Sequence, residues 1–225
     1  LRDTKSSLSE AYLSIRSNLA FSTDHGVPRA VMVTSTRAAE GKSTTSFALA
    51  TVLARTGKKV LLIDADMRSP SMHQFGGKSN KAGLSNFLAG DNDWKLLVNG
   101  NITANLHLLA AGPTPPSAAE LLSSDRMLML VRQALESFDH VVVDSPPILG
   151  LADAPLLSRA VEGCVFVTEA EGVAVRGIKA SLGRLQSVHA HVFGVVLTKL
   201  KSKQAGYGYG YGYGYGYGQS ESASV

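Results

Sequence analysis

The segment between residues 35 and 44 constrains the fold of this chain more than any other part of the sequence. It has the sequence Ser-Thr-Arg-Ala-Ala-Glu-Gly-Lys-Ser-Thr, follows the apolar run 30–33 and precedes a segment with helical periodicity. This strand–loop–helix order is the context of a phosphate-binding loop, in which backbone N–H groups at a helix start surround an anion. In such a loop Lys42 reaches the β- and γ-phosphates and the Ser43 hydroxyl binds Mg²⁺. The segment therefore predicts ATP and Mg²⁺ as cofactors.

The loop departs from the usual G-x-x-x-x-G-K-[ST] pattern at one position, because Thr36 stands where the first glycine is expected. Gly41 is retained and lets the backbone approach the phosphates closely. The alternative is a chance Gly-Lys-Ser at an ordinary helix start, which the strand before it and the helix after it disfavour. The residues expected to bind the nucleotide are Thr36, Arg37, Ala38, Ala39, Glu40, Gly41, Lys42, Ser43 and Thr44.

Carboxylates follow two further strand-like runs. Asp64 and Asp66 come after the apolar run 60–63, and Asp144 comes after the run 140–143. A single Asp after a strand is often only a turn or helix cap. In an open parallel sheet, however, ligands bind outside the carboxyl ends of the strands, so these side chains are expected to converge on the phosphate loop. Mg²⁺ prefers carboxylates, phosphate oxygens and water, and its predicted ligands are Ser43, Asp64, Asp66 and Asp144.

The whole chain alternates between strand-like and helix-like segments after an initial surface helix within residues 1–25. Such alternation predicts an α/β fold with a doubly wound, mostly parallel sheet, of the P-loop NTPase type. We expect residues 69–105 to be an irregular excursion over the active face, with one short helix at 84–88. The predicted strands are 30–34, 60–64, 106–110, 141–144, 164–168 and 192–197, and the other predicted helices are 43–56, 118–137, 152–160 and 175–188.

Composition limits the possible classes of protein. The length of 225 residues suits one α/β domain, and the net charge of +4 is mild. Lys and Arg do not alternate with aromatic residues as in a nucleic-acid-binding surface, so we expect no nucleic-acid partner. The one cysteine, Cys164, lies in an apolar run and is expected in the core. No run reaches the ~20 apolar residues of a membrane span, and the start at Leu1 suggests a piece of a longer protein.

The C-terminal segment 204–225 differs sharply in composition from the rest. It alternates glycine with six tyrosines, and alternating glycine raises backbone entropy, so this tail is expected to be disordered when free. Three interpretations stay open: an aromatic segment prone to association, a linker, or a block of substrate tyrosines for the ATP site. The candidate phosphate acceptors are Tyr207, Tyr209, Tyr211, Tyr213, Tyr215 and Tyr217.

The order of these motifs resembles that of the bacterial tyrosine kinases (BY-kinases), the cytoplasmic kinase domains of exopolysaccharide or capsule co-polymerases. That family carries a phosphate loop, a strand followed by D-x-D-x-R, a strand followed by D-x-x-P, and a C-terminal tyrosine cluster. Here the second motif ends at Arg68 and the third at Pro147, and the resemblance covers nearly the whole chain. The loop differs at Ala38-Ala39, where the family commonly has Pro-Gly, which makes position 39 stiffer.

The resemblance implies an ATP-dependent tyrosine autokinase and a role for each motif residue. Lys42 would stabilise charge on the transferring phosphoryl group, and Ser43 would hold Mg²⁺. Asp144 would orient a Mg²⁺-bound water. Asp64 would take or orient the proton of the tyrosine hydroxyl, with Asp66 assisting the metal, or these two would exchange roles. The implied catalytic set is thus Lys42, Asp64, Asp66 and Asp144.

The resemblance also implies an organisation and partners. Residues 1–203 would form the kinase domain, with an oligomerisation region at 1–25 where Glu10 and Arg16 match the family's E-x-x-R-x-x-R motif and Leu13 replaces its first Arg. These two charges are alternatively only solvated helix residues. The implied partners are further copies of the chain, arranged in a ring, a membrane-spanning co-polymerase segment or activator, and a tyrosine phosphatase. The implied location is the cytoplasmic face of the bacterial inner membrane, with this chain itself soluble.

A second family shares the phosphate loop and the acidic motifs. The Min and Par partitioning ATPases are similar, but they carry a signature Lys where Arg37 stands here. Arg37 is therefore a surface residue, a phosphate contact or a finger across a dimer. The alternative function is a partitioning-type ATPase switch without tyrosine kinase activity.

Overall fold

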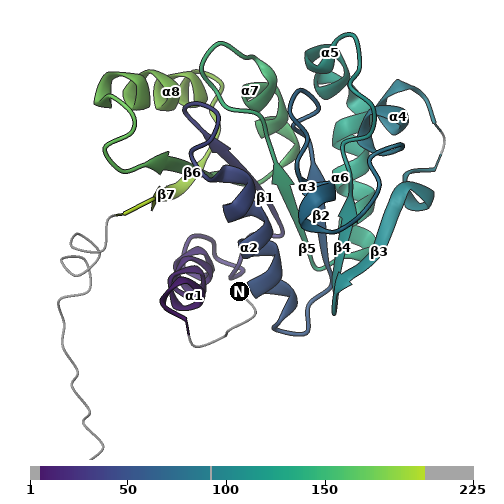
Figure 1. The fold of residues 1–225 in the computed structure, drawn as a ribbon, viewed down its shortest axis with the longest axis horizontal. Helices are drawn as coiled ribbons and strands as arrows, with labels where there is room; N and C mark the ends of the chain where they lie inside the picture. The colour runs from purple at the N-terminus through teal and green to yellow at the C-terminus, as the bar shows by residue number, and fades with distance from the viewer. Residues whose placement is uncertain (1–5, 92, 201–225) are drawn as a thin grey trace, which may run out of the picture.

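A seven-stranded sheet forms the centre of the molecule. The computed structural model describes residues 6–91 and 93–200. The strand order is β3-β4-β2-β5-β1-β6-β7 (Figure 1), and every neighbouring pair is parallel except the antiparallel pair of β3 and β4. The strands are β1 Ala30–Ser35, β2 Val60–Asp64, β3 Val98–Thr103, β4 Leu106–Leu109, β5 His140–Asp144, β6 Gly163–Glu169 and β7 Val192–Thr198.

Helices cover both faces of this sheet. Helices α1, α2 and α3 pack on one face, and α4, η1, α5, α6, α7 and α8 pack on the other. Central strands are consequently buried on both sides: in β1, Val31 and Val33 face the first layer and Ala30 and Met32 face the second. The helices are α1 Ser7–Ala20, α2 Lys42–Ala54, α3 Met72–Phe75, α4 Leu84–Ala89, η1 Trp94–Leu97, α5 Ala118–Ser123, α6 Asp125–Ser137, α7 Asp153–Leu157, η2 Ser158–Ala160 and α8 Val175–Ser187.

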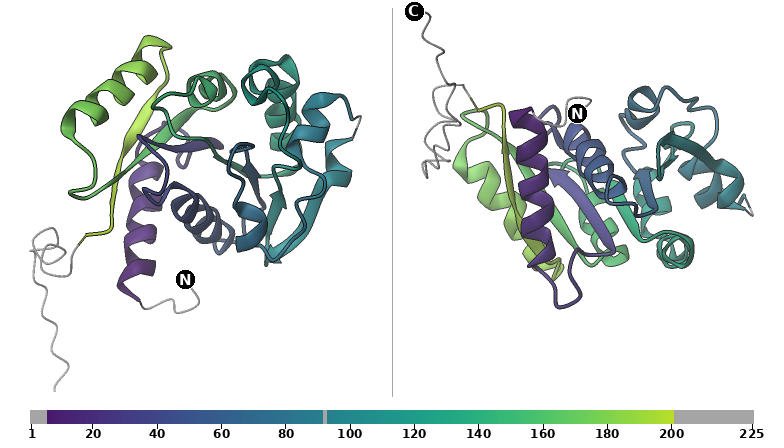
Figure 2. Two further views of the ribbon diagram at one scale, coloured as in Figure 1. Left: turned by 45° about the horizontal axis from the view of Figure 1, so that its top comes forward. Right: turned by 90° about the horizontal axis from the view of Figure 1, so that it is seen from below.

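Helix α2 is the element that fixes the phosphate loop against the sheet. Its central residues are fully or almost fully buried, including Leu49 and Leu53, each of which contributes about 2 kcal/mol of hydrophobic stabilisation. Helix α1 packs beside it, with the Tyr12 hydroxyl 3.4 Å from Thr45 Oγ1, and Figure 2 shows α1 between α2 and β7. Burial on both sides therefore holds the first turn of α2 in one place.

The observed architecture confirms the predicted doubly wound, mostly parallel α/β fold. The expected helix 118–137 is wrong in one respect, because it is two helices, α5 and α6, separated at Ser124. Ser124 has an extended backbone (φ −71°, ψ 153°), and its hydroxyl donates to Leu121 O. Its side chain thus closes the first helix, a competition with helical hydrogen bonding that serine often wins.

The expectation of irregular structure across residues 69–105 is also wrong in part. The short helix predicted at 84–88 is confirmed as α4, but α3, η1 and β3 lie in the same segment. Strand β3 is mostly polar, with Val98 and Ile102 only partly buried, because it is an edge strand that needs few core contacts. Trp94 anchors this segment to α6, since its indole N–H donates to Gln133 Oε1 at 3.0 Å.

Several predictions about the chain ends lie outside the described residues. The tail 204–225 with its tyrosines belongs to them, as does the boundary at 203. Within 6–91 and 93–200, no helix is long and apolar enough to cross a membrane. Helix α1 confirms the predicted N-terminal helix, and its first turn is capped by Ser6 Oγ, which accepts a hydrogen bond from Ser9 N.

Gly83 gives a test of the packing between α4 and the end of β4. A methyl group at Gly83 would lie 2.0 Å from Ala110 O, so no rotamer relieves the clash. We expect Gly83→Ala to lower the free energy of unfolding by at least about 2 kcal/mol in urea titrations. Gly100→Ala, in β3 where a methyl group meets nothing within 4 Å, should change it by less than about 1 kcal/mol. Equal effects would contradict this packing.

Candidate active site

The phosphate loop lies at the carboxyl ends of β1, β5 and β6, at the upper edge of the sheet in Figure 1. Ser35 ends β1, and Lys42 begins α2. Gly41 has a left-handed backbone (φ 90°), and so does Ala39 (φ 66°). The predicted order of strand, loop and helix is thus present, and the loop turns sharply twice before the helix begins.

Lys42 lies at the centre of the site. Its side chain is 9% exposed, and its Nζ is 2.9 Å from Asp66 Oδ2 and 3.6 Å from Asp144 Oδ2. Nζ also donates to Ser43 Oγ at 3.2 Å. Burial alone would lower the pKa of Lys42, but the charges of Asp144 and Asp66 outweigh burial and raise it. The amine therefore stays cationic in a nearly dry site.

Asp144 is fully buried and is held by two hydroxyl groups of α2. Ser43 Oγ donates to Oδ2 and Ser46 Oγ donates to Oδ1, both at 2.8 Å. Burial raises the pKa of Asp144, while Lys42 and these hydroxyls oppose the rise. The sequence reasoning missed Ser46, although its position three residues after Ser43 on a helix placed it on the same face.

Asp64 pairs directly across from Asp144 in the register of β2 and β5. Its Oδ2 accepts backbone N–H groups from Ser71 at 3.0 Å and Met72 at 2.9 Å, and its Oδ1 accepts the N–H of Asp66 at 3.2 Å. Burial and the neighbouring Asp144 charge raise the pKa of Asp64 to about 7, despite these donors. Asp66 and Asp144 thus contact Lys42 directly, and Asp64 lies close enough for its charge to act on Lys42.

A bidentate ion pair ties together the two loops that carry these carboxylates. Arg68 Nε and Nη2 donate to Asp153 Oδ2 and Oδ1 at 2.8 and 3.0 Å. Asp153 is fully buried at the start of α7, whereas Arg68 is 43% exposed. Asp153 was also missed by the sequence reasoning, since an Asp at a helix start ordinarily indicates only a favourable dipole contact.

Other predicted loop residues have distinct surroundings. The side chain of Arg37 is 54% exposed and donates from Nη2 to Gly172 O at 2.6 Å, and its backbone N–H donates to Glu40 Oε2 at 2.6 Å. Glu40 is fully buried with its carboxylate turned toward β6. Ala38 and Thr44 are exposed. In the described part of the chain, the buried Thr36 hydroxyl has no hydrogen-bond partner.

These residues fit a magnesium nucleotide. Helix α2 has no side-chain cap on its first turn among the described residues, so the N–H groups at its start, before Thr45, are open to phosphate oxygens. Ser43 and Asp144 are hydrogen-bonded neighbours, the pair that holds Mg²⁺ in P-loop NTPases. No ready-made cluster of three or more His, Cys, Asp or Glu side chains lies in residues 6–91 and 93–200. Phosphate oxygens and water would therefore have to complete the coordination of Mg²⁺.

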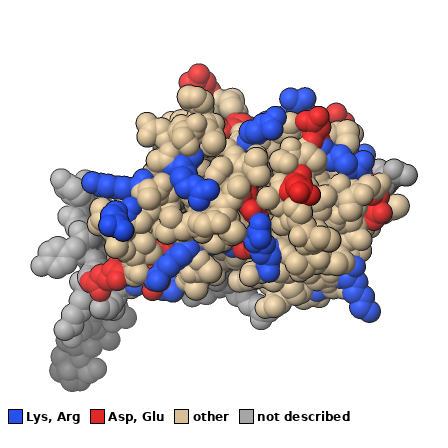
Figure 3. All heavy atoms as spheres, turned by 90° about the horizontal axis from the view of Figure 1, so that it is seen from above, with Lys and Arg blue, Asp and Glu red and all other residues tan. Residues whose placement is uncertain are grey.

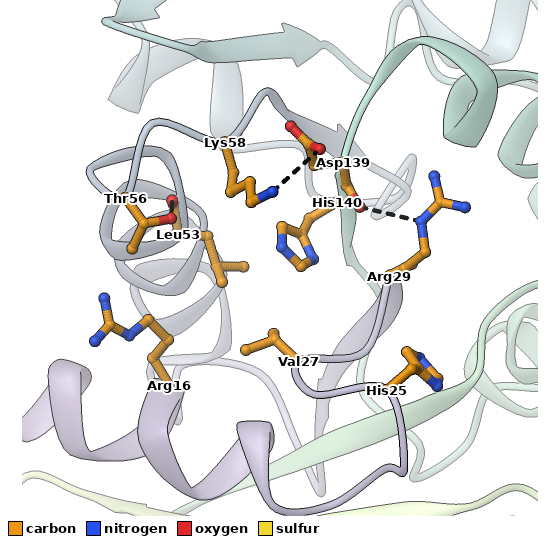
Figure 4. A pocket seen from close by; sticks show the side chains of 9 residues that line it. All are labelled: Arg16, His25, Val27, Arg29, Leu53, Thr56, Lys58, Asp139 and His140. Atoms are coloured by element: carbon orange, nitrogen blue, oxygen red, sulfur yellow. Dashed lines mark hydrogen bonds and ion pairs between the residues drawn. The ribbon is translucent and has the colours of Figure 1, made fainter.

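One of the two predicted oligomer contacts, Arg16, lies away from this site. Arg16 lines a cavity of about 520 Å³ at the amino-terminal edge of the sheet (Figure 4), where Lys58 pairs with Asp139 and Arg29 donates to backbone carbonyls. Glu10 is exposed on α1.

Basic and acidic side chains are intermixed on the surface of the molecule that is seen from above in Figure 3.

Ala39 provides a test of the loop conformation. Its left-handed backbone costs an L-residue roughly 1 kcal/mol, which glycine would not pay. Glycine loses about the same amount through its greater backbone entropy in the unfolded state. Because the two effects nearly cancel, we expect Ala39→Gly to leave the free energy of unfolding unchanged or slightly higher. Ala180→Gly, at an exposed position inside α8, should lower it by about 1 kcal/mol. Urea titrations that show equal losses would contradict the left-handed loop.

The raised pKa of Asp64 predicts a pH dependence of stability. Since its folded-state pKa of about 7 lies above the ordinary pKa of 3.8 for an aspartate, the native state binds the proton more tightly. This contribution is complete below pH ~4 and is lost as pH rises through about 7, by about 4 kcal/mol in total. Asp64→Asn should remove that loss when urea unfolding is compared at pH 5 and 8. The control Asp24→Asn, at an exposed turn, should lose as much stability between pH 5 and 8 as wild type does. If Asp64→Asn also loses as much as wild type, the shift in the pKa of Asp64 is refuted.

Comparison with known proteins places the chain in a family. The model of a family described as an AAA domain matches residues 29–197. Tyrosine-protein kinase YwqD of Bacillus subtilis is 42% identical over 167 residues, which cover 74% of this chain and 70% of that protein. Tyrosine-protein kinase wzc of Salmonella typhi is 35% identical over 198 residues; the match covers 88% of this chain but only 28% of wzc.

Solved structures agree with these relatives. The chimerical protein CapA2B2 superposes with a TM-score of 0.82 at 31% identity, covering 87% of this chain and 86% of that one. The kinase domain of the Escherichia coli tyrosine kinase ETK gives a TM-score of 0.79 at 30% identity, covering 86% and 77%. The septum site-determining protein MinD of Pyrococcus horikoshii, at 20% identity, shares the fold alone. The chain therefore belongs to the bacterial tyrosine-protein kinases, as the motif order predicted.

Proposed function

We propose that this chain transfers the γ-phosphoryl group of Mg-ATP to the tyrosines of its own C-terminal tail, in trans between copies. The observation that supports this most is the buried cluster in which Lys42, Ser43 and Asp144 contact one another at the phosphate loop. The proposed acceptors are Tyr207, Tyr209, Tyr211, Tyr213, Tyr215 and Tyr217.

The proposed chemistry is mainly positioning and charge stabilisation. The free N–H groups of α2 and the loop residues 36–44 hold the triphosphate, and Lys42 exchanges its carboxylate partners for phosphate oxygens. Mg²⁺, held by Ser43 and Asp144, neutralises charge on those oxygens when it is bound. The cluster thus presents fixed positive charge where the transition state gains negative charge.

Asp64 is the proposed acceptor of the tyrosine proton. The tyrosine oxygen forms a bond to the γ-phosphorus, the bond from that phosphorus to the oxygen bridging to the β-phosphate breaks, and ADP leaves. A carboxylate with a pKa of about 7 is matched to accepting a proton at neutral pH. From the described residues, its Oδ1 accepts one long hydrogen bond, from Asp66 N at 3.2 Å, and so retains a lone pair. Asp66, beside Lys42, assists the metal. In the alternative assignment the two residues exchange roles, so that Asp66 accepts the proton and Asp64 assists the metal.

Transfer between copies suits the place where the described chain ends. Strand β7 ends at Thr198, beside the phosphate loop, so the last described residues lie close to the active edge. From residue 203 to 217 it spans about 50 Å when extended and about 20 Å as a flexible coil. These lengths allow a neighbouring copy to be reached in a homo-oligomeric ring. Glu10 and Arg16 on α1 are the proposed contacts between copies.

The proposed cellular role follows from charge and from the family. Full modification adds roughly −9 to −12 charges, enough to overturn the net charge of +4, so modified tails repel one another and loosen the oligomer. We propose that this cycle regulates exopolysaccharide or capsule polymerisation and export at the cytoplasmic face of the inner membrane. A membrane-spanning co-polymerase segment or activator and a tyrosine phosphatase are the proposed partners.

A mixing experiment tests transfer in trans. A Lys42→Met chain with its tail intact is incubated with Mg-ATP and an active chain whose six tail tyrosines are changed to Phe. We expect phosphotyrosine to appear on the Lys42→Met chain, measured by mass spectrometry. Alone, this chain should be at least about 100-fold slower than wild type, because a central charge for the transition state is lost.

The control replaces Lys58, an exposed lysine at the opposite edge of the sheet, and Lys58→Met should keep wild-type autophosphorylation. Phosphotyrosine on wild type but never on the Lys42→Met acceptor would refute transfer in trans. ATP hydrolysis without any phosphotyrosine would favour the partitioning-type ATPase switch instead.

A further inference from the structure

A second network of hydrogen bonds supports the phosphate loop from the side away from Lys42. Its centre is Glu40, which is fully buried. Glu40 Oε2 accepts the backbone N–H of Arg37 at 2.6 Å, and Oε1 accepts the Thr168 hydroxyl at 3.1 Å and the backbone N–H of Glu169 at 3.2 Å. Because three donors meet one carboxylate, the loop is fixed to the end of β6 by its own side chain.

Thr198 connects this network to β7. Its hydroxyl lies 2.6 Å from Glu40 O and 3.3 Å from Thr168 O and donates mainly to the nearer carbonyl. The space beside Gly41 is filled by the same residue, since a Cβ built on Gly41 would lie 3.4 Å from Thr198 Cγ2. Thr198 therefore contacts the two loop residues that directly precede Lys42.

The end of β7 is fixed on both sides of this contact. Thr198 O accepts the backbone N–H of Ala170 at 3.0 Å. Lys199 Nζ pairs with Glu169 Oε1 at 3.2 Å, and Arg37 Nη2 lies 3.6 Å from the other oxygen of that carboxylate. The phosphate loop, the end of β6 and the end of β7 therefore share one polar network.

We propose that Thr198 is a positioning residue for the nucleotide: its hydroxyl fixes the Glu40 carbonyl and so holds the peptide groups before Lys42 in their phosphate-binding orientation. This proposal rests on the Mg-ATP site proposed above. It implies that nucleotide affinity is coupled to the arrangement of residues 198–199 at the end of β7. Such coupling is reciprocal: a partner that binds this end and changes nucleotide affinity by some factor has its own affinity changed by the nucleotide by the same factor.

Three variants separate the hydroxyl from the rest of the side chain. Thr198→Val keeps the methyl group against Gly41 but removes the donor, so the Glu40 carbonyl loses its partner. We expect the Kd for Mg-ADP, measured by calorimetry, to rise about tenfold. Thr198→Ser keeps the donor and should bind within about twofold of wild type. Thr103→Val, at the end of the edge strand β3, is the control and should bind as wild type does.

The kinetic signature separates positioning from a general loss of folding. Thr198→Val should raise the KM for ATP with little change in kcat, because the reacting groups around Lys42 stay in place. Equal affinities of Thr198→Val and wild type would overturn the proposal, and so would equal losses in Thr198→Val and Thr198→Ser. If no variant and no wild-type sample binds Mg-ADP, the proposed nucleotide site itself fails, which is a different result.

Hydrogen exchange of the unaltered chain gives an independent test. If the loop and the end of β7 are coupled, Mg-ADP should slow amide exchange in residues 168–172, where the N–H of Ala170 bonds Thr198 O, as well as in the loop. Slower exchange in the loop alone would contradict the coupling. This measurement needs no variant to fold and no kinase activity.

Discussion

The ion pairs of Lys42 are the interaction on which the site depends. A nearly buried amine is costly unless it is paired, and here two carboxylates from two different strand ends lie within 3.6 Å of it. Burial without a partner would drive Lys42 toward neutrality, while pairing keeps it charged. The same carboxylates repel one another in the absence of Lys42 or a metal ion. The site is therefore arranged around positive charge, which is what a triphosphate requires.

The fold supplies this arrangement by placing three chain segments at one edge of the sheet. Strands β1, β2 and β5 are adjacent and parallel, so their carboxyl ends deliver the phosphate loop, Asp64 and Asp144 to the same place. The pair of Arg68 and Asp153 joins the two acidic loops, and Glu40 joins the phosphate loop to β6. Each loop is thus held by a side chain that has no part in the proposed chemistry.

Much of this could be predicted from the sequence, because strand-end motifs and a parallel sheet leave few possible arrangements. Lys42, Ser43 and Asp144 were predictable from spacing alone. Contacts between distant segments were not: nothing local to Asp153, Glu40 or Thr198 distinguishes a buried partner from an ordinary helix cap or surface residue. Strand β3 escaped prediction for a related reason, since a polar edge strand lacks the apolar alternation that identifies central strands.

In the proposed mechanism Lys42 leaves its carboxylate partners for the phosphates of a bound nucleotide. A crystal structure of the chain with Mg²⁺ and a non-hydrolysable ATP analogue tests it most directly. We expect Lys42 Nζ within hydrogen-bond distance of a β- or γ-phosphate oxygen and Ser43 Oγ about 2.0–2.1 Å from the metal. Nucleotide bound away from the loop, or Lys42 still paired with Asp66 while the analogue is bound, would contradict it.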